Sequence, residues 1–106
     1  MGRDVRRGEI WLAQVGRKER PVLCLTRTEV LDVRSLVTVA EITTSIRGLT
    51  AEVAFDHENV GLQRESVINC DGIHTISQAL MTGPIGKVDD DVMARVCTAL
   101  SYSLGC

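Results

Sequence analysis

Short β-favouring segments, placed close together along the chain, constrain the fold more than any other feature of this sequence. Each is rich in Val, Ile, Leu or Thr, and turn residues such as Gly16, Gly48 and Asp71-Gly72 separate them. The segments span residues 10–15, 20–26, 36–42, 51–55, 66–70 and 73–76. Such spacing is typical of a small, strongly bent antiparallel barrel or sheet.

The last part of the chain changes to a helical pattern. Apolar residues recur at a spacing near 3.6 from Val92 to Leu104, which predicts one amphipathic helix. Asp89 is placed to cap it, and Asp90 and Asp91 suit the positive end of the helix dipole. A metal cluster of the three aspartates is the alternative, and a capped helix start explains them more simply. The fold class is therefore mainly β with a C-terminal helix.

Two other stretches are less regular. Residues 28–34 can form a single helical turn capped by the hydroxyl of Thr28. Residues 77–88 contain Gly83-Pro84 and Gly86, which interrupt any regular pattern, so the sequence leaves the structure of this stretch open.

Length and composition predict one globular domain over residues 1–106, with 44% apolar and 25% charged residues. No apolar run approaches the roughly 20 residues of a membrane helix, and the N-terminus lacks the apolar region of a secretory signal. We therefore expect a cytoplasmic protein with no membrane contact. Basic residues outnumber acidic ones in residues 1–20 although the net charge is −2. This local excess favours contact with an RNA backbone.

The cysteines do not suggest a metal site. No Cys-x-x-Cys pair is present, and only two histidines are available as imidazole ligands, which makes zinc improbable. Cys24 and Cys70 lie in apolar strand-like runs and Cys97 on the apolar helix face, so we expect them in the core, with Cys106 exposed. Reduced thiols agree with a cytoplasmic location.

Arg20 and Pro21 stand at the start of an apolar run. Proline cannot donate to a sheet ladder, so the strand is expected to begin here, with Arg20 just outside it. Other strand ends carry the hydroxyls of residues 43–45 and the polar side chains of Asn69, Asp71 and His74. These groups suit phosphate. Alternatively, the hydroxyls are an ordinary β-favouring strand end, Arg20 is solvated, and His74 is an exposed strand residue.

Five stretches together carry a family resemblance. They are Arg7-Gly8-Glu9-Ile10-Trp11, Arg20-Pro21-Val22-Leu23, Ala40-Glu41-Ile42-Thr43, Ser66-Val67-Ile68-Asn69-Cys70-Asp71 and the terminal helix. In order and spacing they resemble the MazF/PemK-type toxins of type II toxin–antitoxin systems. The resemblance implies an SH3-like barrel, a homodimer, and a metal-independent, sequence-specific endoribonuclease without cofactor. It also implies a cognate antitoxin that covers the active groove with an extended segment.

The same resemblance implies the site residues. Arg20 is similar to the catalytic arginine, Thr43 to the catalytic threonine, and Asp71 to an aspartate implicated in some members. This chain departs from the pattern at Glu19, where some members have histidine, and at Asn69, where some have arginine. The remaining expected contacts to substrate are Arg17, Lys18, Thr44 and Ser45.

The chemistry implied is attack of a ribose 2′-hydroxyl on the adjacent phosphate of single-stranded RNA, which leaves a 2′,3′-cyclic phosphate and a 5′-hydroxyl. Arg20 and Thr43 would stabilise the transition state. We predict Glu19 as the general base, with Asp71 and Arg20 as alternatives. The competing hypothesis is a non-catalytic barrel, either a binding module or a CcdB-like poison of a protein target such as gyrase. The C-terminal residues 103–106 lack the aromatic group expected of such a poison.

Overall fold

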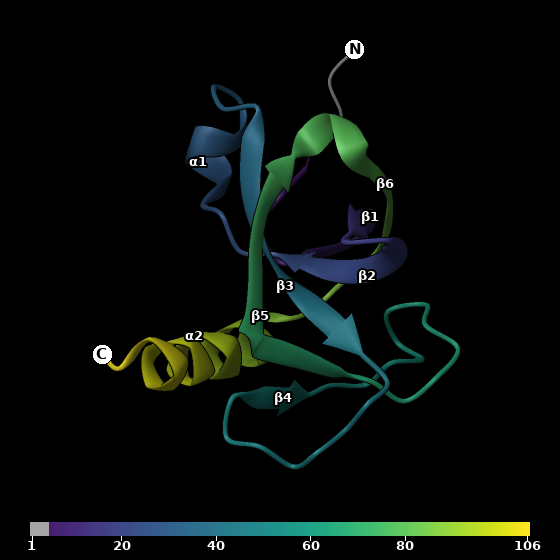
Figure 1. Ribbon diagram of the computed structural model, residues 1–106, viewed down its shortest axis with the longest axis vertical. Coiled ribbons are helices and arrows are strands. Elements are labelled where there is room, and N and C mark those ends of the chain that lie inside the picture. The colour runs from purple at the N-terminus through teal and green to yellow at the C-terminus, as the bar shows by residue number, and fades with distance from the viewer. Residues whose placement is uncertain (1–4) are drawn as a thin grey trace.

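A computed structural model describes residues 5–106 (Figure 1). The part of the predicted domain before Val5, including the start of the N-terminus, lies outside the described residues. The elements in chain order are β1 (Glu9–Val15), β2 (Lys18–Cys24), α1 (Thr28–Leu31), β3 (Leu36–Thr43), β4 (Glu52–Ala54), β5 (Val67–Ser77), the short 3₁₀ helix η1 (Gln78–Leu80), β6 (Met81–Lys87) and α2 (Asp90–Leu104).

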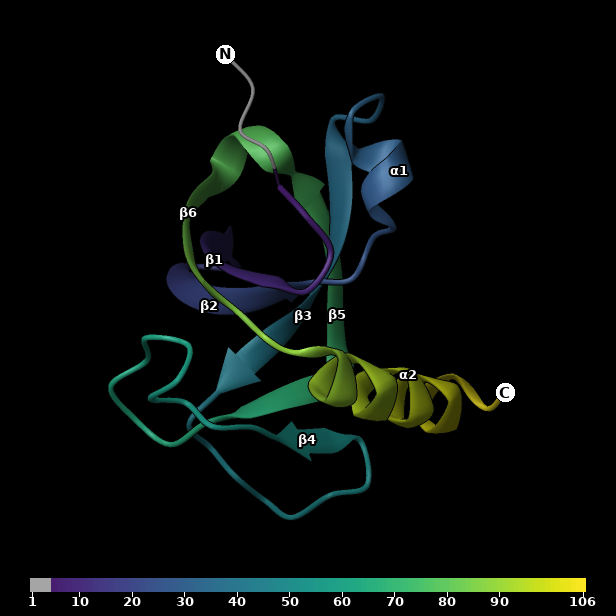
Figure 2. The same ribbon diagram turned by 180° about the vertical axis from the view of Figure 1, so that it is seen from behind.

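The strands form one antiparallel sheet in the order β4-β5-β3-β2-β1-β6. The sheet curls strongly, and α2 packs beside β5 and β4 (Figures 1 and 2). β4 and β6 are its two edges. The predicted class, mainly β with a C-terminal helix, is confirmed.

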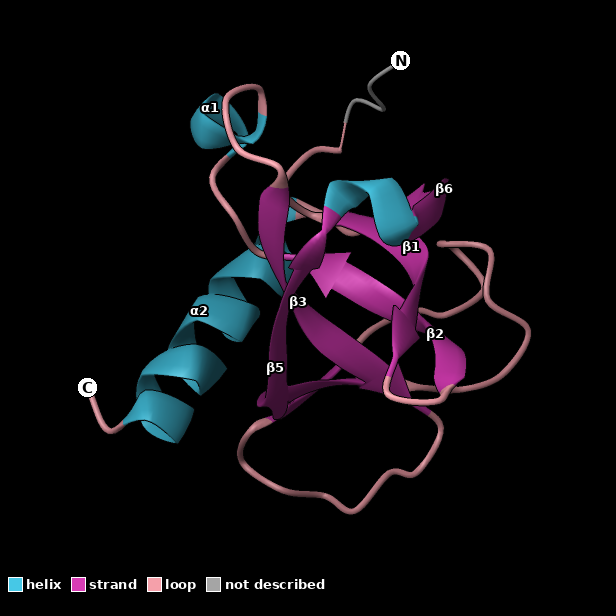
Figure 3. Ribbon diagram, turned by 45° about the horizontal axis from the view of Figure 1, so that its top comes forward, coloured by secondary structure: helices cyan, strands magenta, loops and turns pink. Residues whose placement is uncertain are grey.

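The two faces of the curled sheet bury separate cores. β3 shows this by alternation: Ala40 and Ile42 pack in the core that α2 covers, while Val37 and Val39 pack in a second core around Trp11. Figure 3 shows α2 outside the curl, alongside β5. The residues that continue the second face of β3 beyond Val39 are polar, and they are the ones that form the candidate site.

The predicted turn at Asp71-Gly72 is wrong. β5 runs through it as one strand, and its register with β3 jumps from Ala40↔Ile73 to Glu41↔Asn69. The residues between Asn69 and Ile73 therefore form a bulge that bends β5. An Asp-Gly pair suits a hairpin turn, but here both flanking segments pair with the same neighbour, β3.

Residues 77–88, which the sequence pattern left open, are regular in the structure. This stretch forms η1 and β6, and β6 pairs with β1 around an irregularity between Ile10 and Leu12. Pro84 is tolerated because β6 is an edge strand. Gly86 is required by packing, since a Cβ there would collide with the backbone carbonyl of Val60.

β2 begins two residues earlier than predicted. Val15 pairs with Lys18, so only Gly16 and Arg17 form the turn of the β1–β2 hairpin, and Gly16 has φ +64. Arg20 is consequently inside the strand, paired with Ala13. This register decides which face of β2 each side chain occupies.

The helix predictions are confirmed in part. The Asp89 carboxylate accepts the Val92 backbone N–H at 2.9 Å, as expected of an N-cap. The predicted cap at Thr28 is wrong: Arg27 precedes α1, and the Thr28 hydroxyl instead accepts the Arg7 backbone N–H at 3.2 Å. None of the helices in the described part of the chain has the length and apolar character of a membrane span.

The cysteines follow the prediction except at Cys97. Cys24 and Cys70 are buried, and burial raises the pKa of each thiol to about 11. Cys97 is exposed, because it lies beside the covered stripe of α2 and not within it, and the Arg7 guanidinium contacts its sulfur at 3.3 Å. Cys106 is exposed, as expected.

Candidate active site

A polar hollow opens where β2 and β3 stop pairing. Only Val22–Cys24 of β2 pair with β3, and Pro21, which has no backbone N–H, ends that ladder. The hollow has a volume of about 340 Å³. Its lining residues are Arg20, Glu41, Thr43, Ser45, Arg47, Leu49, Glu52, Asn69 and Asp71. The sequence-predicted residues Arg20, Thr43, Ser45, Asn69 and Asp71 are thus brought together.

Strand register sets most of this wall. Glu41 pairs with Asn69, and Asn69 pairs with Glu52 on its other side, so three polar side chains from β3, β5 and β4 form a row. They continue the face that, further along β3, buries Val37 and Val39. The change from apolar to polar along one strand face separates the core from the site.

Arg20 contributes the cation. Its side chain is 37% exposed, and Nη1 lies 3.4 Å from Oε1 of Glu41. That contact is long for a hydrogen bond, and no other is found for Arg20 among residues 5–106. Most of the guanidinium donors therefore remain available to a phosphate.

Thr43 contributes a hydroxyl at the end of β3. Its Oγ1 accepts the Ser45 backbone N–H at 3.0 Å, which orients the side chain. The hydroxyl proton is not used in that bond, so Thr43 can still donate to a ligand oxygen.

Glu52 shapes the loop that closes one side of the hollow. Its Oε1 accepts the backbone N–H groups of Arg47, Gly48 and Leu49 at 3.0, 2.9 and 3.2 Å. Sequence reasoning assigned Glu52 to a strand only. The Arg47-Gly48 pair followed by an acid was the signal that could have indicated this role.

Asn69 and Asp71 connect the hollow to α2. Oδ1 of Asn69 accepts the Asp71 backbone N–H at 3.0 Å, and Oδ1 of Asp71 accepts the Ser103 hydroxyl at 2.5 Å. Asp71 is therefore held by the bulge of β5 on one side and by the helix on the other.

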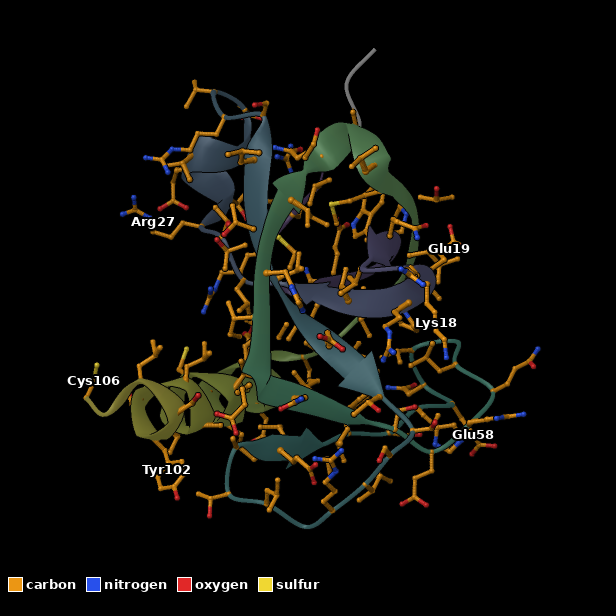
Figure 4. The ribbon with its side chains drawn as sticks, viewed as in Figure 1. Lys18, Glu19, Arg27, Glu58, Tyr102 and Cys106 are labelled. Carbon is orange, nitrogen blue, oxygen red and sulfur yellow. The ribbon has the colours of Figure 1, made fainter. Side chains whose placement is uncertain are left out.

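Glu19 lies outside the hollow, although we predicted it as the base. It pairs with Gln14 and points to the opposite face of β2 from Arg20, because neighbouring residues in a strand alternate. Figure 4 shows Glu19 and Lys18 at the hairpin end of β2. Arg17, Lys18 and Thr44 also lie outside the lining, and all are exposed. The error follows from starting β2 at Arg20, which hid the alternation.

Two residues that were not among the predicted site residues meet at the edge of the hollow. Nε2 of His74 lies 2.5 Å from Oε2 of Glu41. An acid within the otherwise apolar and hydroxyl-bearing run of residues 36–44 was the signal for Glu41. Within the described residues, no group of three His, Cys, Asp or Glu is arranged to hold a metal ion.

Fold and site together define a small curled β protein with one helix and a hollow that joins a guanidinium to a hydroxyl. Residues 6–104 match the family described as PemK-like, MazF-like toxin of type II toxin–antitoxin system. The chain belongs to this family, which confirms the resemblance read from its motifs.

Individual relatives agree. The chain is 51% identical over 96 residues to Endoribonuclease MazF3 of Mycobacterium tuberculosis, covering 91% of this chain and 87% of the relative. It is 35% identical over 103 residues to Probable endoribonuclease MazF5 of the same organism, covering 94% and 93%. The structure of Mycobacterium tuberculosis toxin MazF-mt6 superposes with a TM-score of 0.86 at 37% identity, covering 92% and 96%.

Proposed function

We propose that this chain is the toxin of a toxin–antitoxin pair and acts as a metal-independent, sequence-specific endoribonuclease on single-stranded RNA. The observation that carries the proposal is that Arg20 and Thr43, from adjoining strands, line one hollow. Relatives named as endoribonucleases support the same activity.

In the proposed reaction the 2′-oxygen of a ribose forms a bond to the adjacent phosphorus and the bond from phosphorus to the 5′-oxygen breaks. The products are a 2′,3′-cyclic phosphate and a 5′-hydroxyl end. Arg20 binds non-bridging oxygens with its planar set of donors, and Thr43 donates a further hydrogen bond. Such preorganised donors stabilise the charge that develops in the transition state, and losing one costs roughly 10²–10³ in rate.

Neighbouring residues are proposed to hold the RNA on either side of the cut. Ser45, Asn69 and Asp71 line the hollow and offer hydrogen bonds to unpaired bases. Arg17 and Lys18 flank it on the exposed hairpin, where they would contact phosphates. Thr44 is exposed next to Thr43, outside the lining, where it would contact the RNA beyond the hollow.

We further propose that the toxin works as a homodimer in the cytoplasm, where an extended segment of a cognate antitoxin covers the hollow. The competing function is a non-catalytic toxin that acts on a protein target. The site argues against it, because a hollow that combines a guanidinium, most of whose donors are available, with a hydroxyl suits phosphate chemistry, while a protein-binding role needs neither.

The test is cleavage of a long single-stranded RNA in excess EDTA, with analysis of the ends. Cyclic phosphate and 5′-hydroxyl ends are expected, and Arg20→Ala should reduce the rate by at least about 10²-fold. Arg34→Ala, which removes an exposed arginine outside the hollow, is the matched control and should keep full activity. No cleavage by the wild-type chain, or full activity of Arg20→Ala, would overturn the proposal.

A further inference from the structure

The Glu41 carboxylate lies between two nitrogen groups at the wall of the hollow. Oε1 is 3.4 Å from Nη1 of Arg20, and Oε2 is 2.5 Å from Nε2 of His74. The Glu41 side chain is 20% exposed, against 37% for Arg20 and 36% for His74. A half-buried carboxylate held by two partners has a defined position, which a freely moving surface acid lacks.

The fold makes room for this carboxylate. The bulge in β5 sets Gly72 against Glu41 and Asn69, and a Cβ at Gly72 would lie 3.2 Å from Oε2 and 3.3 Å from Cδ of Glu41, and 3.1 Å from Nδ2 of Asn69. These approaches are closer than ordinary van der Waals contacts. Beyond the bulge, His74 pairs with Val39, two residues before Glu41 on the same face of β3. The bulge thus places the imidazole of His74 beside Glu41, and Gly72, which has no side chain, leaves space for the carboxylate.

We propose that Glu41 is the general base of the reaction and that His74 is its positioning residue; this deepens the proposed function and rests on it. In this assignment Nε2 of His74 carries a hydrogen and donates it to Oε2 of Glu41. When a phosphate takes over the donors of Arg20, Oε1 is released and faces the ribose. His74 therefore leaves one carboxylate oxygen available for proton transfer.

The step balances without any further reactant. Oε1 of Glu41 takes the proton from the 2′-hydroxyl as the 2′-oxygen bonds to phosphorus. The electron pair of the breaking bond goes to the 5′-oxygen, which takes a proton from water in the open hollow. Glu41 then returns its proton to solvent. The net change is one proton moved from the 2′-oxygen to the 5′-oxygen.

Other acids near the hollow are less suited to this role. Glu19 is on the opposite face of β2. One oxygen of Glu52 accepts three backbone N–H groups of the loop, and Asp71 accepts the Ser103 hydroxyl. The charged or titratable groups that share the hollow or its edge with Glu41 are Arg20 on β2, Arg47 in the loop, Glu52 on β4, and Asp71 and His74 on β5.

The first experiment measures single-turnover cleavage by Glu41→Gln. Glutamine keeps the size of the side chain and an oxygen that can accept from Arg20, but it cannot take a proton. We expect kcat to fall by about 10²–10⁴-fold with little change in KM, and the dependence of rate on pH to lose the limb of the base. Glu29→Gln, which removes an exposed acid on α1, is the charge-matched control and should behave as wild type.

A second substrate separates base from acid. An RNA whose bridging 5′-oxygen is replaced by sulfur has a leaving group that needs no proton. The loss in Glu41→Gln should persist on it. Recovery of the wild-type rate there would make Glu41 the acid and overturn the proposal. Activity of Glu41→Gln within about threefold of wild type, with an unchanged pH profile, would also overturn it.

Gly72→Ala supplies an independent test, because it crowds Glu41 and Asn69 without removing a charged group. We expect about a tenfold fall in kcat in the wild-type background, below the roughly 10²-fold that a 1 Å misplacement can cost. In the Glu41→Gln background the same change should have a smaller effect, since the base is already absent and only the displacement of Asn69 still counts. An equal fall in both backgrounds would overturn the role of Glu41.

His74→Gln keeps a donor toward Oε2 of Glu41 and should retain more activity than His74→Ala, as a positioning role requires. Equal activity of wild type, His74→Gln and His74→Ala would remove His74 from the proposal. A wild-type chain that leaves RNA intact would overturn the proposed function itself, and the role of Glu41 with it. Slow cleavage in Glu41→Gln beside fast wild-type cleavage supports both.

Discussion

Replacing Thr43 by valine tests the site by exchanging only its hydroxyl for a methyl group. Valine has nearly the shape of threonine and favours a strand, so β3 should be undisturbed. The change removes the acceptor of the Ser45 N–H, which stands at 3.0 Å, and the donor that we assign to the scissile phosphate. The first loss affects stability and the second affects catalysis, so their sizes can be worked out separately.

The expected loss of folding stability in Thr43→Val is small. The lost hydrogen bond is local and exposed, and such a bond contributes about 1 kcal/mol, which corresponds to a fall in Tm of about 4–8 °C for a domain of this size. A domain that starts at about 5 kcal/mol keeps about 99.9% of its molecules folded after that loss. At 25 °C, unfolding therefore cannot account for a large loss of activity.

The catalytic term is larger. Removing one donor to a developing negative charge costs about 10²-fold in kcat, or about 2.7 kcal/mol. The assay is single-turnover cleavage of a fluorescently labelled single-stranded RNA at 25 °C, with the melting curve measured on the same preparation. Thr82→Val is the matched comparison, because Thr82 is an exposed strand threonine that lies outside the hollow. The reasoning is refuted if Thr43→Val cleaves within about threefold of wild type, or if Thr82→Val loses as much.

Three further predictions concern the fold. Asp89→Ala should lower the free energy of unfolding by about 1 kcal/mol in urea titration, because it removes the N-cap of α2, whereas Asp89→Asn should retain most of it. Gly86→Ala should lower the free energy of unfolding by about 1–3 kcal/mol or more, because its Cβ would collide with the Val60 carbonyl. Gly16→Ala, where no atom lies near the added Cβ, should lower it by less. Equal losses of stability in the two variants would contradict the packing argument. Finally, burial raises the pKa of Cys24 and Cys70 to about 11 from 9.0, so as pH rises the unfolded chain loses these protons before the folded chain does. The free energy of unfolding should therefore fall as pH rises from about 9 to about 11. If its slope against pH is unchanged in the Cys24→Ala and Cys70→Ala variants, this prediction is contradicted.

Several elements could be predicted because their signals are local. The apolar spacing from Val92 onward marks α2, and Asp89 marks its start without reference to the rest of the chain. The β-branched run of β3 follows in the same way. β6 could not be predicted, because Gly83, Pro84 and Gly86 oppose a strand locally. It forms because β6 can pair with the edge of β1, and because Gly86, which has no side chain, lets the backbone of β6 pass close to the Val60 carbonyl.

The candidate site was likewise predictable where its signals are local in sequence and not where they depend on strand geometry. The motifs around Arg20 and Thr43 were enough to indicate the family and to name two residues that the structure brings to one hollow. The prediction of Glu19 as the base was wrong because β2 begins at Lys18, two residues earlier than predicted. Glu19 therefore lies inside the strand, and its side chain points to the face opposite the hollow. A sequence pattern shows that a residue is near a site but not which way it points.

By itself, the sequence determined the family, the β-rich class, the terminal helix and the strand ends that carry polar groups. Those properties depend on neighbours in the chain, so local patterns contain them. The tertiary structure alone decided that a bulge in β5 sets Gly72 and His74 against Glu41, and that the early end of the β2–β3 ladder opens a hollow beside Arg20. Register between strands distant in sequence depends on packing of the whole sheet, and one residue of slip reverses the face of every side chain.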